Sequence, residues 1–160
     1  MKKTKTFSLT LAAMIAALYV VLTYVSNMLG LASGNIQIRL SESLTILPIF
    51  TPAAIFGLFI GCLLSNLLTG CCLIDIILGS VATLLGALGT RVLRKGKFTP
   101  FIPPVISNAI IVPFVLRYGY GLTLPIPFMM LTVGLGEAIS CGVLGYFLRK
   151  ALKKKVNLFR

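Results

Sequence analysis

Residues 43–68 read SLTILPIFTPAAIFGLFIGCLLSNLL, and this stretch decides how many helices the chain has. It is apolar almost throughout, but Pro48 and Pro52 interrupt it. Each proline removes a backbone donor and disfavours helical geometry in the residue before it. We therefore predict a short helix over 42–51 and a longer one over 52–68. The short helix would rise about 15 Å, half of a typical hydrocarbon core, so it must be surrounded by other helices.

The composition of the whole chain is that of a membrane protein. Its 160 residues are 58% hydrophobic and 11% charged, and the mean hydropathy is +1.02. A soluble domain carries about a quarter charged residues. We predict an all-α integral membrane protein, a single domain over 1–160 that forms a six-transmembrane-helix bundle. The predicted helices lie at approximately 7–29, 42–51, 52–68, 74–93, 101–118 and 126–150.

The basic residues favour six spans over five. The fifteen lysines and arginines gather before the first apolar run, around 91–97 and at the end of the chain. Lys and Arg are enriched in cytoplasmic loops. Six spans place all three clusters on the cytoplasmic side together with both termini, and leave Arg39 and Arg117 outside. Five spans would put two of the clusters outside.

The basic start MKKTK followed by an apolar run also resembles a secretory signal peptide. The apolar core of a signal peptide is about 7 to 15 residues long, and the run over 7–29 is longer. Its removal would leave five spans. We therefore expect this segment to stay in the protein as the first helix.

The side-chain inventory argues against several functions. The chain has no His, the commonest metal ligand and general base near neutral pH. Its four cysteines lack CxxC spacing and are typical of small buried hydrophobic residues. The basic residues form no face with interleaved aromatics, as nucleic-acid binding would require. We expect no metal, no cofactor, no nucleic-acid partner and no catalytic residues; an enzyme using two carboxylates is the alternative.

Only three acidic residues occur, Glu42, Asp75 and Glu137, and each lies within or at the edge of an apolar stretch. A carboxylate in hydrocarbon is costly unless it faces a protein interior or a polar cavity. In the predicted topology, two of these acids begin helices at the outer side and Glu137 lies near mid-depth. We predict that they converge on a cavity that captures a polar solute from outside. The other candidates for this pocket are Asn108, Asn66, Arg39, Gln37 and Tyr118.

Most of these residues have a purely structural alternative. Arg39 and Glu42 could neutralise one another at a helix start, and Asp75 could be a helix cap. The two asparagines could form hydrogen bonds between helices. Tyr118 and Tyr120 could anchor at the lipid headgroups instead of stacking on a flat ligand. Glu137 has no basic residue within a helical turn, so we expect this acid to contact the ligand.

The first helix carries Ala12, Ala13, Ala16 and Ala17. Small residues four positions apart let another membrane helix approach closely. The chain contains no P-loop, and the predicted cytoplasmic loops are too short for a nucleotide-binding domain. We therefore predict that these alanines dock a partner that supplies energy.

Three segments resemble a known family: IQIRLSESLTILP over 36–48, NLL at 66–68 and DIILGSVATL over 75–84. The similarity covers essentially the whole chain. It is to the QueT family, the substrate-binding S components of energy-coupling factor (ECF) transporters that take up queuosine precursors. The resemblance implies a non-enzymatic protein of a prokaryotic plasma membrane. It also implies pairing with a transmembrane coupling protein and two cytoplasmic ATPases.

The ligand that this resemblance implies is 7-aminomethyl-7-deazaguanine or a close relative. Its guanine-like edge presents adjacent N–H donors that a carboxylate accepts in bidentate fashion, and its aminomethyl group is cationic. Charge-assisted hydrogen bonds of this kind are about twice as strong as neutral ones. We expect Glu137 or Glu42 to accept hydrogen bonds from the guanine-like edge and another acid to pair with the ammonium group. The alternatives are another vitamin-like heterocycle, or a self-sufficient carrier driven by protons.

Overall fold

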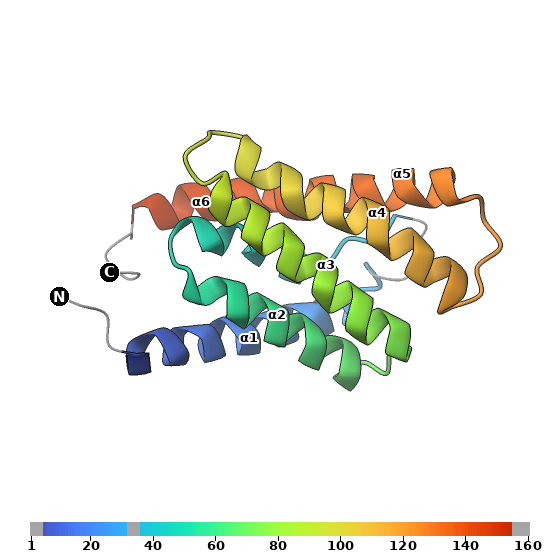
Figure 1. The fold of residues 1–160 in the computed structure, drawn as a ribbon, viewed down its shortest axis with the longest axis horizontal. Coiled ribbons are helices and arrows are strands. Elements are labelled where there is room, and N and C mark those ends of the chain that lie inside the picture. Colours follow the sequence, from blue (N-terminus) through green and yellow to red (C-terminus); the bar gives the residue numbers. More distant parts are fainter. Residues whose placement is uncertain (1–4, 32–35, 155–160) are drawn as a thin grey trace.

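The computed structural model describes residues 5–31 and 36–154, and the elements it contains there are all helices. Their order is α1 Lys5–Met28, η1 Leu40–Ile49, α2 Ala53–Leu68, α3 Leu73–Val92, η2 Thr99–Phe101, α4 Ile102–Tyr118, α5 Ile126–Glu137, η3 Ala138–Leu144 and α6 Gly145–Lys153. The last three follow one another without a break and form one long helix (Figure 1). The predicted all-α class is confirmed.

Four helical segments are long and apolar enough to cross a membrane. They are Lys5–Met28, Leu73–Val92, Thr99–Tyr118 and Ile126–Lys153. About 20 residues of α-helix span the hydrocarbon core of a bilayer. The remaining two, η1 and α2, are shorter apolar segments that pack among these helices. The arrangement is that of a helical membrane bundle.

The short segment η1 is a 3₁₀-helix and not the α-helix that we expected. A 3₁₀-helix rises about 2 Å per residue, so η1 reaches further through the bundle than an α-helix of equal length. Pro48 has no N–H to give to the preceding turn. The hydroxyls of Ser43 and Thr45 donate to carbonyls three residues earlier, at 2.6 Å each. These bonds compete with α-helical pairing and favour the tighter winding.

A basic residue of α3 holds the far end of η1. Nη1 of Arg91 donates to the carbonyl oxygens of Pro48 at 2.9 Å and of Ile49 at 3.2 Å. The last carbonyls of a helix lack partners within the helix, and a cation there is favourable. Arg91 therefore ties η1 to α3.

Two glycines of α2 let α1 come into close contact. A Cβ atom added at Gly57 would lie 2.6 Å from the Ala12 carbonyl oxygen, and one at Gly61 would lie 3.0 Å from Cα of Ala16. Small residues at such a crossing allow the backbones to approach. One of the two alanine pairs of α1 is therefore used inside the chain, where it faces α2.

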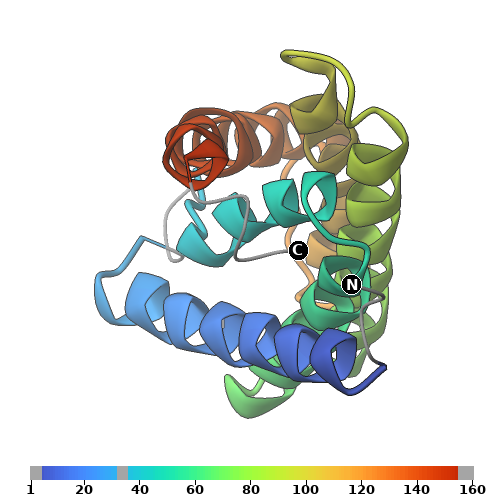
Figure 2. The same ribbon diagram turned by 90° about the vertical axis from the view of Figure 1, so that its left-hand side faces the viewer.

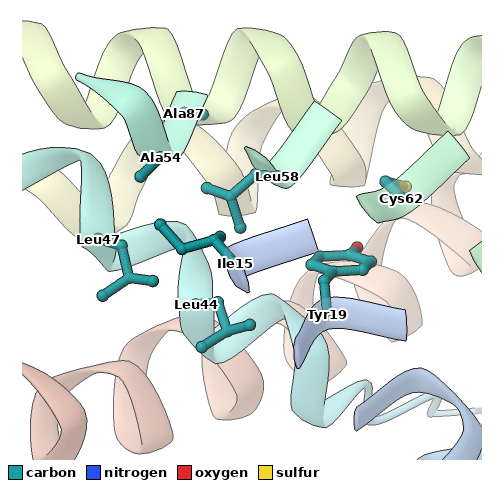
Figure 3. Close-up of a cluster of buried hydrophobic side chains, with 8 residues drawn as sticks. All are labelled: Ile15, Tyr19, Leu44, Leu47, Ala54, Leu58, Cys62 and Ala87. Atoms are coloured by element: carbon teal, nitrogen blue, oxygen red, sulfur yellow. The ribbon is translucent and has the colours of Figure 1, made fainter. Parts of the chain in front are cut away.

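The apolar core lies where α1, η1 and α2 meet, with α3 closing one side (Figure 3). Its buried members are Ile15, Tyr19, Leu44, Leu47, Ala54, Leu58, Cys62 and Ala87. The ring of Tyr19 packs within this cluster, and the residue is only 1% exposed. This core fixes α1 against η1, and η1 carries one of the three acids.

The two ends of the bundle differ in charge. The start of α1, the α3–α4 connection and the last turn of α6 lie at one end (Figures 1 and 2). That end holds most of the described basic residues, whereas Arg117, in the last turn of α4, lies at the opposite end. Lys2, Lys3, Lys155 and Arg160 belong to the same prediction but lie outside the described residues.

Candidate binding pocket

A cavity of about 370 Å³ opens in the half of the bundle away from the α3–α4 connection. This volume is within the usual range for small-molecule sites. The walls come from α1, the segment before η1, η1 itself, α3, α4, α5 and two connections. The main polar residues of the lining are Thr23, Asn27, Gln37, Arg39, Glu42, Asp75, Thr83, Asn108, Tyr120 and Glu137.

The structure brings all three acids to this one cavity. Glu42 is 2% exposed, Asp75 7% and Glu137 8%. Asn108, Gln37 and Arg39 line the same cavity. Six of the eight ligand candidates named from the sequence therefore share a site. Arg39 is the one basic residue in the lining, so acids outnumber bases there.

Two of the named candidates lie elsewhere. Asn66 is buried between α2 and α3, where Nδ2 donates to the Asp75 carbonyl oxygen at 3.3 Å. Tyr118 is 72% exposed and stacks on Phe114 at 6.5 Å between ring centroids. Its position matches the anchoring alternative. The tyrosine that lines the cavity is instead Tyr120.

Glu42 and Glu137 approach one another from different elements. Their carboxylate oxygens and Sγ of Cys141 all lie within 4.8 Å of one another. Sγ of Cys141 is 3.1 Å from Oε2 of Glu137. Two carboxylates this close in a low dielectric repel, so they favour a cation or hydrogen-bond donors between them. The three groups would also suffice to ligate a metal ion.

The sequence pattern around Cys141 indicates only a small buried hydrophobic residue. Positions 137 and 141 are one helical turn apart and share a face, and this spacing was the signal that could have found it. The cysteine lies in η3, a π-helical stretch of the long last helix. Such stretches are rare and occur often at functional sites.

The extended segment before η1 is held against the helix that carries Glu137. A Cβ atom at Gly136 would lie only 2.1 Å from the Gln37 carbonyl oxygen, so a glycine is needed there. The backbone N–H of Arg39 donates to Oγ of Ser140 at 3.1 Å. These two contacts set the position from which the chain enters η1 and places Glu42.

A tyrosine of α1 completes this side of the pocket. The hydroxyl of Tyr19 donates a hydrogen bond to Oε1 of Glu42. Oε2 of Glu42 is buried and has no hydrogen-bond partner among the residues the structure describes. Leaving a buried polar atom unpaired costs about 1–3 kcal/mol, and more for a charged group. Tyr19 was not among the predicted site residues, although it follows Ala12 and Ala16 at helical spacing and so shares their inward face.

Asp75, the acid of α3, has a hydrogen-bond partner of its own. The Tyr120 hydroxyl donates to Oδ2 of Asp75 at 2.8 Å. Burial, followed by hydrogen bonds to Cys71 and Asp75, raises the pKa of Tyr120 above its ordinary value. Tyr120 therefore stays protonated at neutral pH and remains a donor to Asp75.

Long apolar helices around a buried acidic pocket define an α-helical membrane protein of the multi-pass class. Residues 9–154 match the family described as QueT transporter, and the chain belongs to this family. It is 32% identical over 171 residues, covering all of both chains, to the queuosine precursor transporter QueT of Lactococcus lactis subsp. cremoris (strain MG1363). No solved structure matched the chain. The family resemblance noted in the sequence is confirmed.

Proposed function

We propose that this chain is the substrate-binding S component of an ECF-type importer and captures 7-aminomethyl-7-deazaguanine or a close relative from outside. The observation that carries the ligand assignment is the buried, unpartnered Oε2 of Glu42 close to the Glu137 carboxylate. A ligand that presents adjacent N–H donors would satisfy this oxygen. The name of the Lactococcus relative supports the same class of ligand.

The charge of the pocket supports a cationic ligand. Three acids and one arginine line the cavity, so the ionised site carries an excess of negative charge. The ammonium of an aminomethyl group would offset part of it through charge-assisted hydrogen bonds. We propose that Glu42 or Glu137 receives the guanine-like edge and that another acid receives the ammonium. Asp75 with Tyr120 is the candidate for that second role.

The distribution of basic residues supports an outward-facing site. The pocket opens in the half of the bundle away from the end where α6 finishes and α3 joins α4. Arg94, Lys95, Lys150 and Lys153 lie on that other end. By the bias of Lys and Arg towards the cytoplasm, that end faces inward with both termini, and the pocket faces outward.

A transmembrane coupling protein and two cytoplasmic ATPases would drive release of the ligand to the inside. We propose that one of the two alanine pairs of α1, Ala13 with Ala17, docks the coupling protein. Ala12 and Ala16 contact α2, whereas Ala13 and Ala17 are exposed. Exposed small residues four apart would let a helix of the coupling protein approach α1 closely.

Two experiments test this function. Titration of the purified protein with 7-aminomethyl-7-deazaguanine, its nitrile precursor, the free base of queuosine and unrelated vitamins should show selective binding of a deazaguanine. Affinity purification from cells that express the partners should recover a coupling protein with two ATPases. Uptake by vesicles that contain this chain alone would contradict the S-component assignment and favour a proton-coupled carrier.

A further inference from the structure

A second, apolar cavity runs along the last helix from Ala138, the residue after the pocket acid Glu137, towards the end where α3 joins α4. It measures about 380 Å³ and lies between the segment that leads into α4 and the long last helix. Phe98 and Phe101 form one wall, and Gly142, Tyr146 and Phe147 belong to the other. Phe98 and Phe147 are both more than half exposed, so the groove opens to the exterior of the bundle.

A basic pocket of about 150 Å³ adjoins this groove. Its lining consists of Lys97, Tyr146, Arg149, Lys150 and Lys153. Tyr146 lines both cavities, so the groove and the basic pocket are neighbours. No acid belongs to either lining, because the three acids of the chain line the binding pocket. The combined surface is apolar at one end and positively charged at the other.

Contacts between the two walls fix this surface in place. Nη2 of Arg149 donates to the Gly96 carbonyl oxygen at 3.0 Å, and its guanidinium lies 5.9 Å from the ring centre of Phe101. The rings of Phe98 and Tyr146, one from each wall, stack with their centroids 6.4 Å apart. The α3–α4 connection is thus attached to α6. In the π-helical stretch, a Cβ atom at Gly142 would meet no heavy atom within 4 Å, so the groove is open there.

We infer that this surface binds an anionic phospholipid, with an acyl chain in the apolar groove and the phosphate among Lys97, Lys150 and Lys153. Basic pockets between membrane helices on the cytoplasmic side are typical sites for anionic head groups. A free anion would make no use of the apolar groove, and a neutral lipid would make no use of the lysines. The surface also lies across the bundle from α1, which carries the proposed docking pair (Figures 1 and 2).

The test compares two lipids that differ only in the head group. Lipid-stripped protein in mild detergent is titrated with dioleoylphosphatidylglycerol or dioleoylphosphatidylcholine, and thermal unfolding and native mass spectrometry report binding. The anionic lipid should bind with a half-saturating concentration roughly tenfold lower. Equal binding of the two lipids would overturn the inference. So would equal protection by water-soluble glycerol phosphate, since that outcome assigns the basic pocket to a free anion.

Two sets of variants locate the site. Replacement of Lys97, Lys150 and Lys153 by Gln should abolish the preference for the anionic lipid, whereas Arg94→Gln with Lys95→Gln, exposed and outside both linings, should keep it. Gly142→Leu should fill the groove and weaken binding of the anionic lipid at least about fivefold. An unchanged preference in both sets would refute the site.

The unfolding temperature without added lipid shows whether each variant still folds. If Gly142→Leu unfolds on its own, the lysine variants decide the question. If Gly142→Leu instead prevents assembly with a coupling protein and leaves the lipid preference intact, the groove belongs to a protein partner and the lipid assignment is wrong.

Discussion

The hydroxyl of Tyr19 in α1 donates a hydrogen bond to Glu42 in η1, across 23 positions of sequence. Tyr19 is packed in the core between α1, η1 and α2, so its hydroxyl has a fixed place (Figure 3). The bond occupies Oε1 and leaves Oε2 for another donor. One contact therefore joins the helix that carries the proposed docking pair to an acid of the pocket.

Tyr19→Phe should weaken ligand binding while the protein stays folded. The variant keeps the ring in the core but removes the donor to Glu42, and a hydrogen bond to a charged group contributes about 1.5–3 kcal/mol. We expect the affinity for 7-aminomethyl-7-deazaguanine to fall roughly tenfold or more by calorimetry. Tyr24→Phe is the control, because the Tyr24 hydroxyl donates to the Leu68 carbonyl away from the pocket. Equal affinity of both variants and the parent would contradict this role of Tyr19.

Gly136→Ala should disturb the pocket more than Gly134→Ala does. A Cβ atom at Gly136 would lie 2.1 Å from a backbone oxygen of Gln37, whereas one at Gly134 would make an ordinary 3.6 Å contact. The first change must displace the segment that positions Glu42, at a cost of about 1–3 kcal/mol for overpacking. Thermal unfolding and ligand titration of the two variants give the comparison. Identical values for both would show that the close approach is unimportant.

Substitution of the two alanine pairs of α1 should have different effects, one on assembly with the coupling protein and the other on the stability of the chain. Ala13→Leu with Ala17→Leu changes exposed positions, so ligand binding and the unfolding temperature should persist while recovery of the coupling protein falls. Ala12→Leu with Ala16→Leu should instead destabilise the chain itself, because these residues meet α2. Affinity purification and thermal unfolding measure the two effects. Normal assembly of the Ala13 and Ala17 variant would refute docking through this face.

Arg91→Gln should lower the stability of the protein. The change weakens two hydrogen bonds to the end of η1 and removes a favourable charge there, together worth about 1–3 kcal/mol. Arg94→Gln is the matched control, since Arg94 is exposed in the following loop. A drop in unfolding temperature should appear for Arg91→Gln alone. Equal unfolding temperatures of the two variants would mean that the hydrogen bonds from Arg91 do not stabilise the end of η1.

Much of the fold was predictable, because hydropathy and proline placement are local properties. Pro48 and Pro52 identify the break between the short and the longer helix, and Pro52 indeed precedes α2 directly. The 3₁₀ winding of η1 was not predicted, since it depends on side-chain hydroxyls that compete for carbonyls. The π-helical stretch likewise had no local sequence signal that we recognised.

The part of the site formed by acidic residues was predictable, because their charge alone requires a polar environment. An acid in an apolar run must find a polar cavity, and Glu42, Asp75 and Glu137 share one. Tyr19 and Cys141 were missed because both types of residue are ordinary in apolar helices. Their roles depend on which face of a helix meets the pocket, and this is set by packing between helices. The same uncertainty applied to the alanines of α1, whose spacing does not tell an internal contact from an external one.

Calorimetric binding of 7-aminomethyl-7-deazaguanine to the parent, Glu42→Gln and Glu137→Gln tests the central claim most directly. Glutamine keeps the size of the side chain but removes the charge and replaces an acceptor with a donor. We predict that each substitution lowers the affinity at least about tenfold while the folded protein is retained. Parental affinity in both variants would contradict the assignment of these two carboxylates to the ligand.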